Sequence, residues 1–134
     1  MSSTHPDFAG VDVANLSDTE AVKILQANAA EPTKLLNGEI LELDSKRGVC
    51  RYRFKIVPAF CHSQGRICQD GFLTGMVDVA MANAAMSKCN FAFAVPTLEL
   101  KISFLEAAGP GFVIAEGRLR AALPGLPSSS LPDE

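Results

Sequence analysis

The sequence predicts an α+β domain in which antiparallel strands accompany one long apolar helix. The strands are indicated by residues 38–56, where GEILELD and VCRYRFKI flank a turn at residues 45–48. Apolar and basic residues alternate in the second segment, which is typical of a strand with one buried face. Its expected buried residues are Cys50, Tyr52, Phe54 and Ile56. The helix is indicated by residues 70–86, DGFLTGMVDVAMANAAM, which are apolar on nearly every side and therefore expected to be buried.

The size and charge of the chain limit the kinds of protein that it can be. Its 134 residues suit one domain with one moderate core. The net charge of −3, with both signs interspersed, provides no basic patch for nucleic acid. The chain begins without a signal-peptide pattern and has no apolar segment long enough to span a bilayer, so we expect a cytoplasmic protein that does not bind membranes. The expected partner is a small molecule.

The cysteines and histidines do not form a metal-binding pattern. Cys50, Cys61, Cys68 and Cys89 are scattered without a CxxC pair, and the chain has only two histidines. We therefore expect no metal, no other cofactor, and thiols that remain reduced.

The chain divides into three expected parts. Residues 1–30 form a loose arm and a short helix, which begins at the capping box Ser17-Asp18-Thr19-Glu20. Residues 31–120 form the main domain. Residues 121–134 are rich in proline and serine and are expected to be irregular, because proline lacks the donor that a central strand needs.

Two more strands are predicted after the long helix. The first covers residues 97–104, where apolar and polar residues alternate. Its apolar side comprises Leu98, Leu100, Ile102 and Phe104. A turn at Gly109-Pro110-Gly111 then leads into the second strand, FVIAEGRLR.

The long helix carries one narrow polar line. Asp70, Thr74 and Asp78 are spaced four residues apart and therefore share one face. This line can simply face solvent. Asp78, however, lies in the middle of an apolar helix, and burying an unpaired carboxylate is costly, so a functional role is the alternative.

Several motifs resemble one known family when they are taken in order. Gln69-Asp70-Gly71 opens the helix, Asp78 follows seven residues after Gly71, and PTLELKISFLEAAGPG and AEGR come next. From about Glu31 to Arg118 the chain is similar to the PaaI-like branch of the hotdog-fold acyl-CoA thioesterases. The resemblance implies a curled antiparallel sheet wrapped around the long helix, and a homodimer or homotetramer whose cleft takes a coenzyme A thioester.

The resemblance also implies roles for individual residues. Asp78 would be the nucleophile, or the general base that directs water at the thioester carbonyl. Backbone amides around Asp70 and Gly71 would bind the oxyanion, and Gly71 would either let the thioester approach or allow a tight turn. The remaining positions form a candidate substrate-binding set: Gln69, His62, Ser63, Thr74 and Thr97. Thr97 would act across the dimer, or be chosen only as a β-branched strand residue.

Two positions depart from the family pattern. Asp70 stands where the first glycine would be, and we interpret it as an N-cap. An asparagine expected before the helix corresponds to His62 or to Ser63, depending on how the connection is aligned. In addition, residues 121–134 do not read as the two strands that complete the family's sheet.

Three functions are consistent with these features. The first is hydrolysis of a small, medium-chain or aryl acyl-CoA thioester. The second is a hotdog-fold enoyl-thioester hydratase or dehydratase that uses His62 and Asp78. The third is a catalytically inactive subunit that binds acyl-CoA, which the unusual Asp70 and the C-terminal departure would explain.

Overall fold

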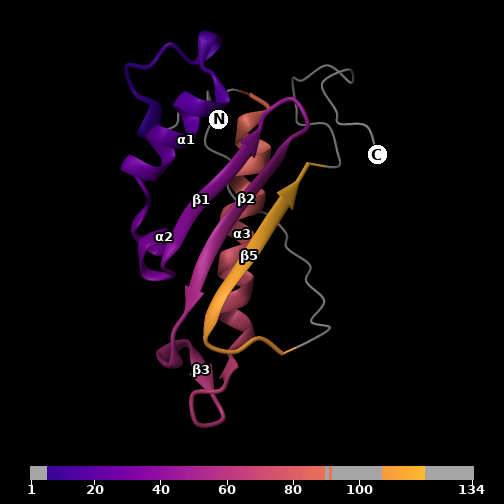
Figure 1. Cartoon of the computed structure of the whole chain (residues 1–134). Coiled ribbons are helices and arrows are strands. Elements are labelled where there is room, and N and C mark those ends of the chain that lie inside the picture. The colour runs from indigo at the N-terminus through magenta and orange to yellow at the C-terminus, as the bar shows by residue number, and fades with distance from the viewer. Residues whose placement is uncertain (1–5, 90, 92–106, 120–134) are drawn as a thin grey trace.

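The computed structural model describes residues 6–89, 91 and 107–119, in which short N-terminal helices are followed by strands, one long helix and a further strand (Figure 1). The helices are α1 (Asp18–Ala27), α2 (Glu31–Leu35) and α3 (Asp70–Ser87), and the strands are β1 (Gly38–Asp44), β2 (Val49–Ile56), β3 (Cys61–His62), β4 (Ile67–Cys68) and β5 (Gly111–Arg118). Short 3-10 turns cover Pro6–Phe8, Val13–Asn15 and Pro58–Phe60.

The main sheet is antiparallel, with the strand order β1-β2-β5. The predicted hairpin of β1 and β2 is confirmed, and Val49 at one end of β2 pairs with both Asp44 and Arg118. The register of the hairpin shifts between Ile40 and Glu42, so Leu41 is the extra residue of a bulge. The second predicted strand after the helix is confirmed as β5. The predicted strand at residues 97–104 and the tail at residues 121–134 lie outside the described residues.

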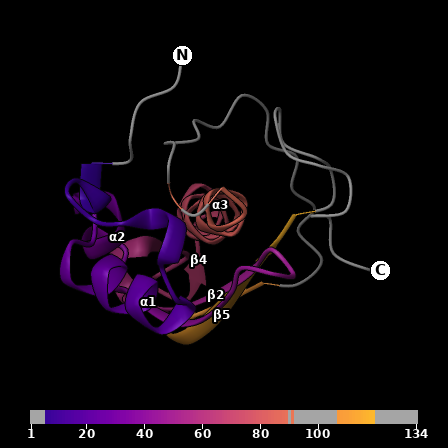
Figure 2. The same cartoon turned by 90° about the horizontal axis from the view of Figure 1, so that it is seen from above.

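Helix α3 packs against the inner face of this sheet, and Figure 2 shows the sheet curving along one side of it. The four residues of β2 predicted to be inside are all buried. Gly117 of β5 makes the contact especially close, because a Cβ there would lie 2.6 Å from the Cα of Met81 and would also collide with the carbonyl of Ala80. The AEGR segment therefore has a structural requirement for glycine at its third position.

The N-terminal segment covers the edge of the sheet that β1 forms. Ser17 caps α1 by accepting a hydrogen bond from the amide of Glu20, at 3.2 Å, which confirms the predicted helix start. The α1 helix packs on β1. Phe8 is fully buried and stacks on Phe91 with ring centroids 4.5 Å apart, so this part of the arm is anchored to the core.

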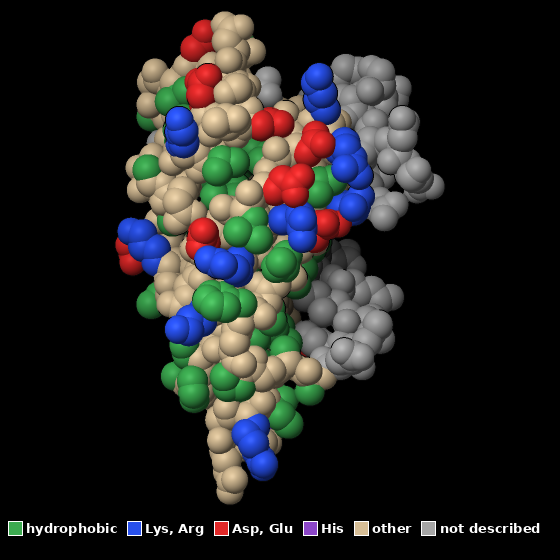
Figure 3. Space-filling model, viewed as in Figure 1, with side chains coloured by type: hydrophobic (Ala, Val, Ile, Leu, Met, Phe, Trp, Pro, Cys, Tyr) green, Lys and Arg blue, Asp and Glu red, His purple; other side chains and the backbone are tan. Residues whose placement is uncertain are grey.

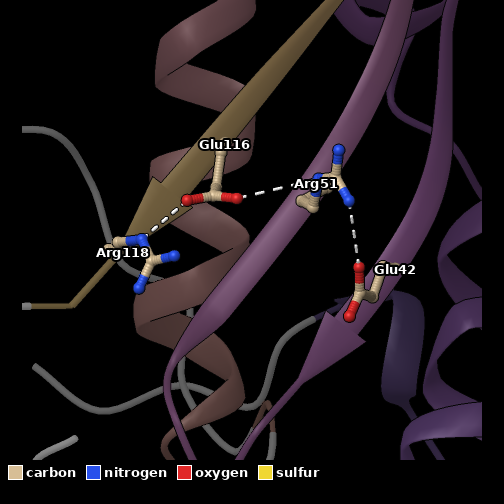
Figure 4. Close-up of polar contacts among 4 residues, drawn as sticks. All are labelled: Glu42, Arg51, Glu116 and Arg118. Atoms are coloured by element: carbon tan, nitrogen blue, oxygen red, sulfur yellow. Dashed lines mark hydrogen bonds and ion pairs between the residues drawn. The ribbon is translucent and has the colours of Figure 1, made fainter. Parts of the chain in front are cut away.

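The outer face of the sheet carries mixed charges, as Figure 3 shows. Arg51 is 3.4 Å from Glu42 on β1 and 3.7 Å from Glu116 on β5, and Glu116 also pairs with Arg118 at 2.6 Å (Figure 4). These side chains are all partly exposed, and such surface pairs contribute little to stability. The alternation in residues 49–56 predicted one buried face, and the charged residues on the opposite face are partly exposed to solvent, as expected.

No helix within the described ranges is long and apolar enough to cross a bilayer.

Candidate active site

The start of α3 forms the first part of the candidate site. Gln69 is the N-cap: its backbone is extended (φ −66°, ψ 137°), and its side chain makes no capping hydrogen bond. Its carbonyl accepts from the amides of Phe72 at 3.0 Å and Leu73 at 3.4 Å. The prediction that Asp70 is the N-cap is therefore wrong. The helix begins one residue earlier, so Asp70 is its first helical residue and its carboxylate lies in the first turn, where the helix dipole favours negative charge.

The amides of Asp70 and Gly71 have no hydrogen-bond acceptor within α3, so the helix leaves them available to a ligand. The first N–H groups of a helix have no acceptor within the helix, and here the amide of Phe72 already uses the Gln69 carbonyl. Both residues are exposed. Two amides at the positive end of a helix can together bind a developing oxyanion.

Gly71 has no structural need to be glycine within the described part of the chain. Its backbone is helical rather than left-handed, so it does not serve a tight turn. A Cβ added to Gly71 would meet no atom within 4 Å. An alanine would therefore fit at this position, and it would be more favourable in a helix than glycine. The glycine, and the open space that it leaves beside the two amides, need an explanation.

Asp78 faces away from the sheet. It lies two positions from Met76 and two from Ala80, both fully buried, so it is about 160° around the helix from each of them. The side chain is half-buried. Asp70, Thr74 and Asp78 follow this side of α3, as predicted, and the Thr74 hydroxyl donates to the Asp70 carbonyl at 2.9 Å.

His62 and Ser63 lie in the small β3–β4 hairpin that leads directly into α3. The His62 Nδ1 and the Ser63 hydroxyl are 2.9 Å apart, and both residues are exposed. The tip is a tight turn, with left-handed backbone at Ser63 (φ 55°), Gln64 (φ 63°) and Gly65 (φ 77°). The hairpin is attached to the N-terminal end of α3, whereas Asp78 is eight residues into the helix, about 12 Å along its axis from Asp70.

Thr97, the last predicted site residue, lies outside the described residues. Among those that are described, no cluster of three or more His, Cys, Asp or Glu side chains could hold a metal ion.

A buried polar contact that the sequence did not indicate holds α3 on the sheet. Asn83 donates to the hydroxyl of Tyr52 on β2 at 3.1 Å and to the carbonyl of Val79 at 3.0 Å. Burial raises the pKa of Tyr52, and the nearby Cys50 and Asp7 raise it further, so the phenol stays protonated. The signal available in the sequence was a lone asparagine within an apolar helix.

Comparison with known proteins shows what this arrangement is similar to. Residues 69–122 match the model of a family described as the thioesterase superfamily, and this segment contains α3 and β5. Residues 69–122 of this chain therefore resemble the thioesterase superfamily. No curated protein matches the chain.

Solved structures confirm that this chain has the hotdog fold. A putative thioesterase from Ralstonia eutropha, titled as phenylacetic acid degradation-related, has a TM-score of 0.67 at 24% identity, covering 77% of this chain and 80% of its own. The PaaI protein of Escherichia coli has a TM-score of 0.65 at 19% identity, covering 80% and 71%. A conserved protein from Pseudomonas aeruginosa has a TM-score of 0.64 at 25% identity, covering 71% and 74%. The resemblance to PaaI-like hotdog thioesterases is therefore confirmed, by the match over residues 69–122 and by the shared fold.

Proposed function

We propose that this protein hydrolyses an acyl-CoA thioester, releasing a carboxylic acid and the free thiol of coenzyme A. The observation that carries the proposal is the start of α3. Gly71 leaves open space beside two helix amides, although nothing among the described residues requires a glycine there. A thioester carbonyl that approaches these amides accounts for both features, because the developing oxyanion needs donors within about 3 Å.

In this proposal Asp78 supplies the second chemical group. As a nucleophile it would attack the carbonyl carbon, form an anhydride and expel the CoA thiolate, and water would then hydrolyse the anhydride. As a general base it would take a proton from a water molecule that attacks the same carbon. Both routes end with the same acid and thiol, and both need the carboxylate of Asp78 on the substrate side of α3.

The spacing of the two groups favours a site shared between two subunits. Gly71 and Asp78 are seven residues apart, which is about 10 Å along the helix axis. Reacting atoms must lie about 3–3.5 Å apart, so one carbonyl held at Gly71 is too far from Asp78 of the same helix. In a homodimer with two neighbouring, antiparallel α3 helices, the Gly71 amide of one subunit would meet Asp78 of the partner subunit.

Other predicted site residues would complete the binding site. Gln69 is exposed beside the two amides and would position the thioester. Thr97 would reach Asp78 across the dimer. Phe60 and Phe72 stack with ring centroids 4.6 Å apart and are both half-buried, so they offer apolar surface close to the helix start for a small, medium-chain or aryl acyl group.

Release of free thiol from a panel of acyl-CoA substrates tests the proposal. The wild-type protein should release CoA thiol, and Asp78→Asn, which keeps the shape of the side chain, should lose about 10²–10⁴ in kcat. Glu31→Gln is the matched control, because it also neutralises one carboxylate but lies on α2. Wild-type turnover by a folded Asp78→Asn protein would remove Asp78 from the mechanism, and absence of thiol release from every substrate would refute the proposed activity.

A further inference from the structure

Two cysteines face each other in the β3–β4 hairpin, immediately before α3. Cys61 and Cys68 are register partners in this antiparallel pair. The Gln69 amide donates to the Phe60 carbonyl at 2.9 Å, one position outside the pair, so Cys61 and Cys68 occupy a non-hydrogen-bonded position of the ladder. Cα atoms at such positions are about 4.5 Å apart, within the range that a disulfide can bridge.

The two thiols lie on the same side of the hairpin, because the residues are register partners. Each sulfur also lies near a backbone carbonyl: Cys61 Sγ is 3.5 Å from the oxygen of Val57, and Cys68 Sγ is 3.7 Å from that of Gln69. Both cysteines are free in this structure. The register and the free thiols together describe a dithiol that can close without rearranging the hairpin.

We propose that Cys61 and Cys68 form a reversible disulfide by exchange with a low-molecular-weight disulfide such as oxidised glutathione. The thiolate of Cys61 attacks one sulfur of glutathione disulfide, which breaks the glutathione S–S bond, forms a mixed disulfide and releases one glutathione thiol. The thiolate of Cys68 then attacks the Cys61 sulfur, forms the Cys61–Cys68 bond and releases the second glutathione. The protein loses two electrons and two protons, and the two glutathione thiols gain them.

The order of the two steps follows from exposure. Cys61 is half-buried and can be reached from solvent, whereas Cys68 is only 1% exposed. Burial raises the pKa of Cys68, and the neighbouring Cys61 and Asp70 raise it further. Cys68 therefore reacts poorly with an external disulfide, but it is well placed to attack a sulfur that is already beside it.

The remaining cysteines provide the contrast. Cys50 is fully buried on the inner face of β2, and burial, with a contribution from Glu42, raises its pKa to about 12. Cys89 lies just after the C-terminal end of α3, where its sulfur is 3.2 Å from the carbonyl of Met86. Only the Cys61–Cys68 pair combines a facing register with an accessible sulfur among the described residues.

The disulfide would fix the connection that leads into the proposed oxyanion site, because Cys68 is followed directly by the N-cap Gln69. Its formation can be tested without reference to catalysis. The reduced full-length protein is incubated with oxidised glutathione, and free thiols are counted after unfolding. The count should fall from four to two per chain. Intact mass should show the loss of two hydrogen atoms, and dithiothreitol should reverse both changes.

Peptide mapping locates the bond. Trypsin cleaves after Lys55, Arg66 and Lys88, so Cys61 and Cys68 fall in the separate peptides 56–66 and 67–88. Before reduction, the oxidised protein should yield these two peptides as one linked species. Cys61→Ala should abolish the linked species, and the matched control Cys89→Ala should retain it. A stable glutathione adduct on Cys61 without the linked peptides, or four thiols that persist in the folded protein, would overturn the proposal.

Discussion

Replacing Gly71 with alanine tests the proposed oxyanion site most directly, because stability and activity are expected to change in opposite directions. The added methyl group meets no atom within 4 Å, and the backbone there is already helical. Alanine in a helix is favoured over glycine, so the free energy of unfolding should rise by about 0.4–1 kcal/mol. In a chain of this size that corresponds to an increase in Tm of about 2–5 °C.

The activity of Gly71→Ala should fall because of where the new methyl group would lie. In an α-helix the Cα–Cβ bond tilts toward the N-terminus, so the methyl group would lean into the space in front of the amides of Asp70 and Gly71. Complete loss of one oxyanion donor costs about 10²–10³ in kcat. The amide itself remains in this variant, so we expect a smaller loss of about 10- to 100-fold in kcat/KM.

Gly75→Ala is the matched control, since it is the same substitution one turn later in α3. Its Cβ would be 3.4 Å from Leu36 Cδ1, an ordinary packing contact, and it should gain similar stability without losing turnover. Thermal melts and thiol release at several substrate concentrations measure both quantities. If Gly71→Ala is more stable and keeps kcat/KM within about twofold of the parent, the thioester does not approach Gly71 and the site is wrongly placed.

Three further predictions concern packing, charge and assembly. Gly117→Ala should lower the free energy of unfolding by about 1–3 kcal/mol, because the backbone of Met81 blocks the new methyl group; an unchanged Tm would contradict the close packing of β5 on α3. Asp70→Ser should change that free energy by less than about 1 kcal/mol, since Asp70 is not the N-cap, and should keep or raise turnover; a large loss of activity in a stable variant would give Asp70 a chemical role. Turnover per chain should decrease on dilution as subunits separate, and light scattering that shows a fully active monomer would refute the shared site.

The parts of the fold that the sequence predicted are those with strong periodicity. The alternation in β2 needs only the two-residue repeat of a strand, and the structure buries the predicted residues. The capping box at Ser17 was predicted from a local pattern and is also present. The hotdog fold itself came from the order of motifs, because periodicity gives the elements but not how a sheet curves around a helix.

The sequence named candidate site residues, whose roles stay predictions, but it did not give the geometry of the helix start. The first turn of α3 was misassigned by one residue, because Asp70 is a favourable N-cap in isolation while the Gln69 carbonyl begins the helix in the fold. The Cys61–Cys68 pair was not predicted either. Cys68 follows Cys61 by seven positions in the sequence, and only the register of a hairpin with two-residue strands makes them partners.

The proposed shared site also explains why α3 is apolar on the side that faces away from the sheet. Met81 is 39% exposed on that side, and Ala82 and Ala85 there are half-buried. Burial of apolar surface contributes about 25 cal/mol per Å², so covering these side chains with a second copy of the helix would stabilise a dimer. Asp78 would then be enclosed at the interface, where a carboxylate is costly unless a polar group faces it. The thioester and the helix amides of the partner subunit would supply such polar groups beside Asp78, as the shared site requires.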